Sequence, residues 1–133
     1  MAEITGVAHV ALTVTDLPRS KDWYSDLFGT QVLFEGEDTD AGIKFCVTIH
    51  PPTNLILGFR EFHNSSGDRF TPERTGLDHL SFTCADRAEL EKWQTVFEEK
   101  GITYSPIVDT DYGHVLSFKD PDNIALELFA YTS

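Results

Sequence analysis

Residues 9–29, HVALTVTDLPRSKDWYSDLFG, decide the fold of this chain because the same pattern returns 70 residues later. The second copy, residues 79–101, is HLSFTCADRAELEKWQTVFEEKG. Each stretch begins with alternating residues typical of a strand, passes an aspartate, and continues with apolar residues at helical spacing before a glycine. The sequence therefore contains one structural unit twice.

The repeat extends beyond these two stretches. Sliding the chain on itself by 70 residues without a gap also aligns Thr5 with Thr75, Gly6 with Gly76, Pro51 with Pro121 and Phe59 with Phe129. We expect two units, residues 5–62 and 75–131, joined by a linker at residues 63–74 that is rich in loop-forming residues. Units of this size are too small to be stable alone, so we expect one domain, residues 5–131, with a shared core.

Each unit is predicted to have the element order βαβββ. The first strands are expected at Val7–Val14 and Leu77–Cys84, and the helices start after Asp16 and Asp86 and end at Gly29 and Gly101. Three apolar runs with turn residues between them follow the first helix, around Gln31–Phe34, Ile43–Ile49 and Leu55–Phe59. This pattern predicts an α+β fold.

Composition excludes several classes of function. The chain has 133 residues and a net charge of −12, with ten Lys and Arg and no basic run, so a nucleic-acid partner is not expected. No apolar run approaches the roughly 18 to 20 residues of a membrane span, and the N-terminus does not resemble a signal peptide. We expect a cytoplasmic protein in which Cys46 and Cys84 are reduced.

The histidines that open the two copies are predicted to face away from the helices. In an extended strand, side chains alternate between the two faces of the sheet. In the second copy the apolar face carries Leu80, Phe82 and Cys84, and the polar face carries His79, Ser81 and Thr83. The apolar face suits packing under the helix. Two histidines at equivalent positions, His9 and His79, suggest a shared metal ion, with ordinary core or surface residues as the alternative.

Glu127 supplies a carboxylate for the same site. It interrupts the apolar run from Ile124 to Phe129, where an unpaired buried carboxylate would cost several kcal/mol. A metal ion would offset that cost. A carboxylate that points out of an edge strand or pairs with arginine is the alternative. The predicted metal ligands are therefore His9, His79 and Glu127.

Three segments of the chain resemble the vicinal oxygen chelate superfamily. They are HVALTVTDLPRSKDWYSDLFG at residues 9–29, GLDHLSF at 76–82 and FKDPDNIALELF at 118–129. That superfamily includes glyoxalase I, extradiol dioxygenases, fosfomycin resistance enzymes and bleomycin resistance proteins. The resemblance implies two βαβββ units paired around a cleft, and one divalent metal ion that chelates a small substrate through adjacent oxygens.

The fourth ligand position of the family is predicted to be empty. The gapless offset aligns Glu127 with Leu57, where glyoxalase I carries a glutamate, and leucine cannot bind a metal or move a proton. Glyoxalase I activity is therefore disfavoured. A site of two histidines and one carboxylate holds Fe(II), Mn, Ni or Zn with open positions. We expect an extradiol-type dioxygenase or another metal-assisted lyase or transferase, with a non-catalytic antibiotic-sequestering protein as the alternative.

Two further sets of residues are candidates for the chemistry and for substrate binding. Tyr112 and His114 are predicted to act as acid or base, with ordinary turn and strand residues as the alternative. Phe45, Phe59 and Phe129 are candidates to line an apolar pocket, with plain core packing as the alternative. The resemblance also implies a homodimer, whose site forms within one chain or draws on both.

Overall fold

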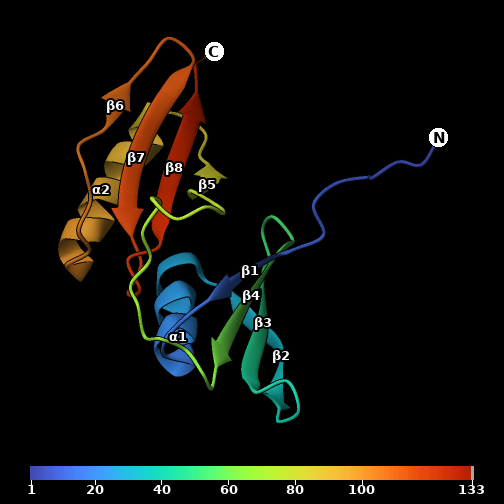
Figure 1. Ribbon diagram of the computed structural model, residues 1–133. Coiled ribbons are helices and arrows are strands. Elements are labelled where there is room, and N and C mark those ends of the chain that lie inside the picture. Colours follow the sequence, from blue (N-terminus) through green and yellow to red (C-terminus); the bar gives the residue numbers. More distant parts are fainter. Residues whose placement is uncertain (133) are drawn as a thin grey trace. The chain divides into compact units, whose positions relative to one another are not determined.

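The chain folds into two compact units, with the boundary between Asp68 and Arg69, inside the predicted linker. The computed structural model describes residues 1–132, and each unit is treated by itself. Both units have the order βαβββ, which confirms the predicted α+β class (Figure 1).

Each unit contains one four-stranded sheet and one helix (Figure 1). The first unit comprises β1 (Val10–Thr13), α1 (Leu17–Phe28), β2 (Gln31–Asp38), β3 (Ile43–His50) and β4 (Leu55–Phe62), with sheet order β1-β4-β3-β2. The second comprises β5 (Leu80–Thr83), α2 (Arg87–Lys100), β6 (Val108–Asp109), β7 (Gly113–Lys119) and β8 (Ala125–Tyr131), with sheet order β5-β8-β7-β6. In both sheets the first strand runs parallel to the last, and the other pairs are antiparallel. The first strands begin three residues later than predicted.

The helices start and stop where the sequence predicts. The carboxylates of Asp16 and Asp86 accept hydrogen bonds from backbone N–H groups three residues later, at 3.1 and 2.9 Å. Gly29 and Gly101 end the helices in the left-handed conformation, with φ of 77° and 68°. No helix among residues 1–132 is long and apolar enough to span a membrane.

One face of each sheet lies under its helix and is called the covered face; the other is the open face. In β8, the side chains of Leu126, Leu128 and Ala130 are at most 1% exposed, whereas the residues between them are half-buried. The ring of Phe97 from α2 lies 4.5 Å from that of Phe118 in β7. Because large apolar side chains each contribute about 1.5–3 kcal/mol on full burial, this packing fixes which residues face α2.

The first unit follows the same rule. The ring of Tyr24 from α1 lies 5.0 Å from that of Phe59 in β4, and both side chains are fully buried. Leu57, two residues earlier, is 1% exposed on the same face. Gly58 lies between them and therefore belongs to the open face.

The strand registers correct the gapless alignment of the two copies. Val10 of β1 pairs with Leu57 of β4. Leu80 of β5, which is 70 residues after Val10, pairs with Leu126 of β8. The structural counterpart of Leu57 is thus Leu126. Glu127 corresponds to Gly58, not to Leu57 as the sequence offset predicts.

A difference of one residue between two hairpins causes this shift. Asn54 and Asn123 each take a positive φ, 60° and 66°, at the entry to the last strand of their unit, and counting from 54 to 123 they are 69 residues apart. The β7–β8 hairpin is therefore one residue shorter than the β3–β4 hairpin. A shift of one residue moves every side chain to the other face of a strand.

Two single variants, with glutamate at Leu57 or at Gly58, test this register. We expect Leu57→Glu to lower the free energy of unfolding by roughly 3–5 kcal/mol, because it leaves a charge unpaired under α1. Gly58→Glu should lower it by less, because the new side chain would leave from the face that α1 does not cover and a Cβ at Gly58 meets no atom closer than 3.6 Å. Urea denaturation followed by circular dichroism measures both values. Equal losses would show that the faces are assigned incorrectly.

Candidate metal centre

Two of the three predicted ligands meet on the open face of the second unit. Nε2 of His79 lies 3.5 Å from Oε1 of Glu127. Two donors bound to one ion at roughly 2.0–2.1 Å in tetrahedral geometry stand about 3.3 Å apart. The spacing of these two atoms therefore fits a shared cation.

Glu127 occupies a sheltered position with hydroxyl neighbours. It is level with Ser81 on β5 and Ser117 on β7, and its side chain is 18% exposed. Among residues 1–132 its ion-pair partner is His79, and no lysine or arginine pairs with it. The arginine-paired alternative raised from the sequence does not apply.

Asp78 orients the imidazole of His79 and was missed by the sequence reasoning. Its Oδ1 lies 2.8 Å from Nδ1 of His79, and this hydrogen bond raises the pKa of His79 above its ordinary value. A carboxylate on one ring nitrogen leaves the other free for a metal, an arrangement common around metal-bound histidines. The sequence did offer a signal for Asp78: an acidic residue directly precedes His79, whereas Ala8 precedes His9 in the first copy.

His9 and Gly58 belong to the open face of the first unit by strand alternation. His9 is exposed and directly precedes β1. Ala11, two residues later, is level with Gly58, and a Cβ at Gly58 would lie 3.6 Å from that of Ala11. Gly58, the equivalent of Glu127, thus offers no metal donor because glycine has no side chain. Within either unit, residues 1–132 contain no group of three His, Cys, Asp or Glu placed to hold a metal ion.

The predicted pocket phenylalanines divide between the two faces. Phe45 is level with Gly36 and Phe129 with Thr83, both on open faces. Phe59 lies on the covered face, fully buried against α1, so it serves the core and cannot line an open-face pocket.

Tyr112 lies beside Phe129. Its ring stacks on that of Phe129 with centroids 6.1 Å apart and planes 13° apart, and the residue is 66% exposed. Phe129 is two residues beyond Glu127 on the same face of β8. Tyr112 therefore stands next to the face that carries Glu127.

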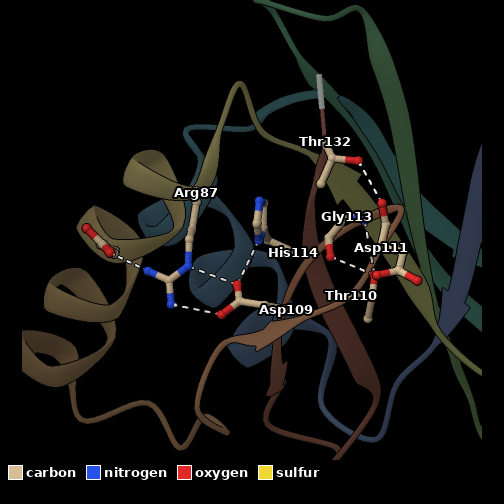
Figure 2. Close-up of polar contacts among 8 residues, drawn as sticks. Arg87, Asp109, Thr110, Asp111, Gly113, His114 and Thr132 are labelled. Atoms are coloured by element: carbon tan, nitrogen blue, oxygen red, sulfur yellow. Dashed lines mark hydrogen bonds and ion pairs between the residues drawn. The ribbon is translucent and has the colours of Figure 1, made fainter.

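His114 lies on the other side of the sheet. It is level with the fully buried Ala130 of the covered face. Its Nδ1 lies 2.7 Å from Oδ1 of Asp109, and the same oxygen accepts a hydrogen bond from Nε of Arg87 at 2.9 Å (Figure 2). The predicted acid–base role of His114 at the Glu127 site does not fit this placement.

The contacts around His114 explain how a two-residue strand stays in place. Figure 2 shows Asp109 of β6 between Arg87 of α2 and His114 of β7, and Arg87 also bonds to Glu91 one helical turn on. The hydrogen bonds from Arg87 and His114 hold the pKa of Asp109 below its ordinary value. Sequence reasoning missed Arg87 and Asp109, since 22 residues separate them. This group fastens β6 to α2 and β7.

Sequence relatives of the chain agree with the fold. The family described as the glyoxalase/bleomycin resistance protein/dioxygenase superfamily matches residues 6–128. The protein YwkD of Bacillus subtilis is 29% identical over 95% of this chain and 97% of its own length. Biphenyl-2,3-diol 1,2-dioxygenase 3 of Rhodococcus globerulus is 29% identical over 92% of this chain, which spans 61% of that enzyme.

Solved structures give the same assignment. A glyoxylase/bleomycin resistance protein/dioxygenase domain from Frankia sp. EAN1pec is 32% identical, with a TM-score of 0.89 over 98% of this chain and all of the other. The fosfomycin resistance protein FosX of Listeria monocytogenes, as a variant complexed with Mn(II) and 1S,2S-dihydroxypropylphosphonic acid, shares the fold at 20% identity, with a TM-score of 0.74 over 98% of this chain and 93% of its own. The chain belongs to the glyoxalase/bleomycin resistance protein/dioxygenase superfamily.

Proposed function

We propose that the protein is a divalent-metal-dependent enzyme whose ligands are His9, His79 and Glu127. The observation that carries the proposal is the pair of His79 and Glu127 on one open face, with Asp78 fixing the imidazole. His9 is the third ligand because its strand position is equivalent to that of His79 in the duplicated unit. Fe(II), Mn, Ni and Zn all suit this donor set.

The first unit supplies no counterpart of the Glu127 carboxylate to the proposed centre. Glu127 has no acidic counterpart, because Gly58 stands at the equivalent register position. A glyoxalase I reaction uses a second carboxylate to move a proton between carbons, so that reaction stays disfavoured, now on account of Gly58. When bound, a divalent ion in such a three-ligand set polarises adjacent substrate oxygens, and as Fe(II) it also supports reactions of O2.

Extradiol-type cleavage of a catechol is the reaction that we infer. A catechol presents two adjacent oxygens, and aromatic side chains such as Phe45 and Phe129 on the open faces suit an aromatic ring. The similarity to a biphenyl-2,3-diol dioxygenase supports this substrate class. Tyr112, whose ring stacks on Phe129, is the proposed acid–base group. The active form is proposed to be a homodimer, as the family resemblance implies.

Metal content tests the ligand set directly. His9→Ala, His79→Ala and Glu127→Ala should each lose bound metal, whereas Asp78→Asn should bind it roughly 10–100-fold more weakly, because it weakens the orienting hydrogen bond. His50→Ala is the matched control, since His50 bonds to Thr53 in the β3–β4 turn. Elemental analysis and Mn(II) titration give the affinities. Undiminished binding by the three alanine variants would rule out this centre.

Oxygen consumption tests the reaction. Fe(II)-loaded protein should take up one O2 per catechol and open the ring next to the hydroxyls, so that both oxygen atoms enter the product. An oxygen electrode with mass spectrometry of products made under ¹⁸O2 measures this. Absence of uptake across a panel of catechols would exclude ring cleavage. Tight binding of aromatic ligands without turnover would then favour the sequestering alternative.

Paired substitutions separate the two acid–base candidates. Tyr112→Phe should lower kcat by about 10²-fold or more with little change in KM, because it removes the proposed proton-transfer group. His114→Gln should leave kcat within about threefold, because His114 faces the covered side and bonds to Asp109. Steady-state kinetics across the pH range give both constants. The opposite ranking of the two variants would contradict the assignment.

A further inference from the structure

Thr110 opens the turn that carries Tyr112, the proposed acid–base group. The turn, residues 110–113, joins β6 to β7 within the second unit. We propose that Thr110 is a positioning residue, whose hydroxyl closes this turn and thereby holds the ring of Tyr112 on that of Phe129. Phe129 is two residues beyond Glu127 on the same face of β8. This inference rests on the proposed function, in which Tyr112 transfers the proton.

The hydroxyl of Thr110 both donates and accepts a hydrogen bond across the turn. Its Oγ1 donates to the carbonyl oxygen of Gly113 at 2.7 Å and accepts from the N–H of Gly113 at 3.1 Å (Figure 2). The backbone N–H of Thr110 donates to the same carbonyl oxygen at 2.9 Å. Thr110 is half-buried, and hydrogen bonds sheltered from water are stronger. Three hydrogen bonds therefore close a turn whose two inner residues are Asp111 and Tyr112.

Contacts on either side hold the turn in place. Asp109, the residue before it, accepts hydrogen bonds from the guanidinium of Arg87 on α2 (Figure 2). After β8, Thr132 donates from Oγ1 to the carbonyl oxygen of Asp111 at 3.1 Å. The backbone N–H of Thr132 donates to the carbonyl oxygen of Tyr112 at 3.2 Å. The backbone of both inner residues is thus fixed, which sets the direction in which Tyr112 leaves the turn.

Gly113 makes room for the ring on which Tyr112 stacks. A Cβ at Gly113 would clash with the ring of Phe129 and would lie 2.9 Å from the carbonyl oxygen of Ala130. The ring of Tyr131 meets Phe129 edge-on, with centroids 4.6 Å apart and planes 60° apart. Phe129 is therefore supported on two sides, and the stacked ring of Tyr112 uses it as a platform.

Tyr112 needs this support because packing alone does not hold it. The residue is 66% exposed, so its position depends on the turn and on the stack with Phe129. An acid–base group must stand within hydrogen-bond reach of the atom that it serves. A displacement of about 1 Å can lower a rate by roughly 10²-fold.

Steady-state kinetics of Fe(II)-loaded protein with catechol test the role of the hydroxyl. Thr110→Val, which keeps the shape of the side chain, should lower kcat by about 10-fold and change KM by less than about twofold. Thr110→Ser keeps the hydroxyl and should bring kcat back to within about twofold of the parent. Thr71→Val is the matched control, because Thr71 is a half-buried turn residue of the same unit whose hydroxyl accepts a hydrogen bond from the N–H of Glu73. It should behave as the parent.

A double variant shows whether Thr110 acts through Tyr112. In the Tyr112→Phe background, which lacks the proposed proton-transfer group, Thr110→Val should lower kcat no further. A loss of the same size in both backgrounds would mean that Thr110 only stabilises the fold, and it would overturn the positioning role. Unchanged kcat in Thr110→Val, or no recovery in Thr110→Ser, would overturn it as well.

Nuclear magnetic resonance tests the position of the ring without turnover. Nuclear Overhauser effects between the ring protons of Tyr112 and Phe129 are expected in the parent and in Thr71→Val, and they should weaken in Thr110→Val. Absence of catechol turnover by the parent would overturn the proposed reaction alone. The ring contacts then decide whether Thr110 holds Tyr112: weaker contacts in Thr110→Val support that role, and unchanged contacts end it.

Discussion

The structure depends on one constraint, which is that a single helix can cover only one face of a four-stranded sheet. Alternation along each strand sends one set of side chains under the helix, and close packing against rings such as Phe97 and Tyr24 fixes that set. Within its own unit, as residues 1–132 describe it, the remaining set has no helix above it. Polar and aromatic groups can stand there without disrupting the core, and every candidate for the chemistry that we retain lies on or beside such a face.

The two copies keep the scaffold and differ in the chemistry that they present. Glu127 has Gly58 as its counterpart, and Asp78 has Ala8. The strand that follows the helix also differs in length: β2 of the first unit has eight residues, and β6 of the second unit has two. A duplicated backbone thus supports different donors in its two halves, because open-face side chains contribute less to the packing under the helix than covered ones do.

The sequence predicted the scaffold well, because its signals are local. Asp16 and Asp86 cap the helices through hydrogen bonds to nearby backbone groups, and the alternation around His79 reveals its face without knowledge of the rest of the chain. Glu127 was assigned to the site of His79 because it interrupts an apolar run, and the two side chains do lie together.

The errors arose where geometry depends on distant or cumulative features. The counterpart of Glu127 is Gly58 and not Leu57 because the β7–β8 hairpin is one residue shorter than the β3–β4 hairpin. A gapless comparison cannot detect this difference in length, yet a shift of one residue moves a side chain to the other face of the sheet. His114 was misassigned because its partner Asp109 and the helix residue Arg87 meet only in the folded sheet. Phe59 was placed in a pocket because apolar residues on either face look alike in a sequence.

The long edge strand β2 carries a further consequence for the behaviour of the protein at high concentration. All eight of its residues are exposed, and an edge of this length is a template for pairing with strands of other molecules. Its register is broken between Val32 and Phe34, and its second half carries Glu35, Glu37 and Asp38. Irregular geometry and mutual repulsion of carboxylates both disfavour aggregation, so part of the acidity of this chain protects the sheet edge that needs it most.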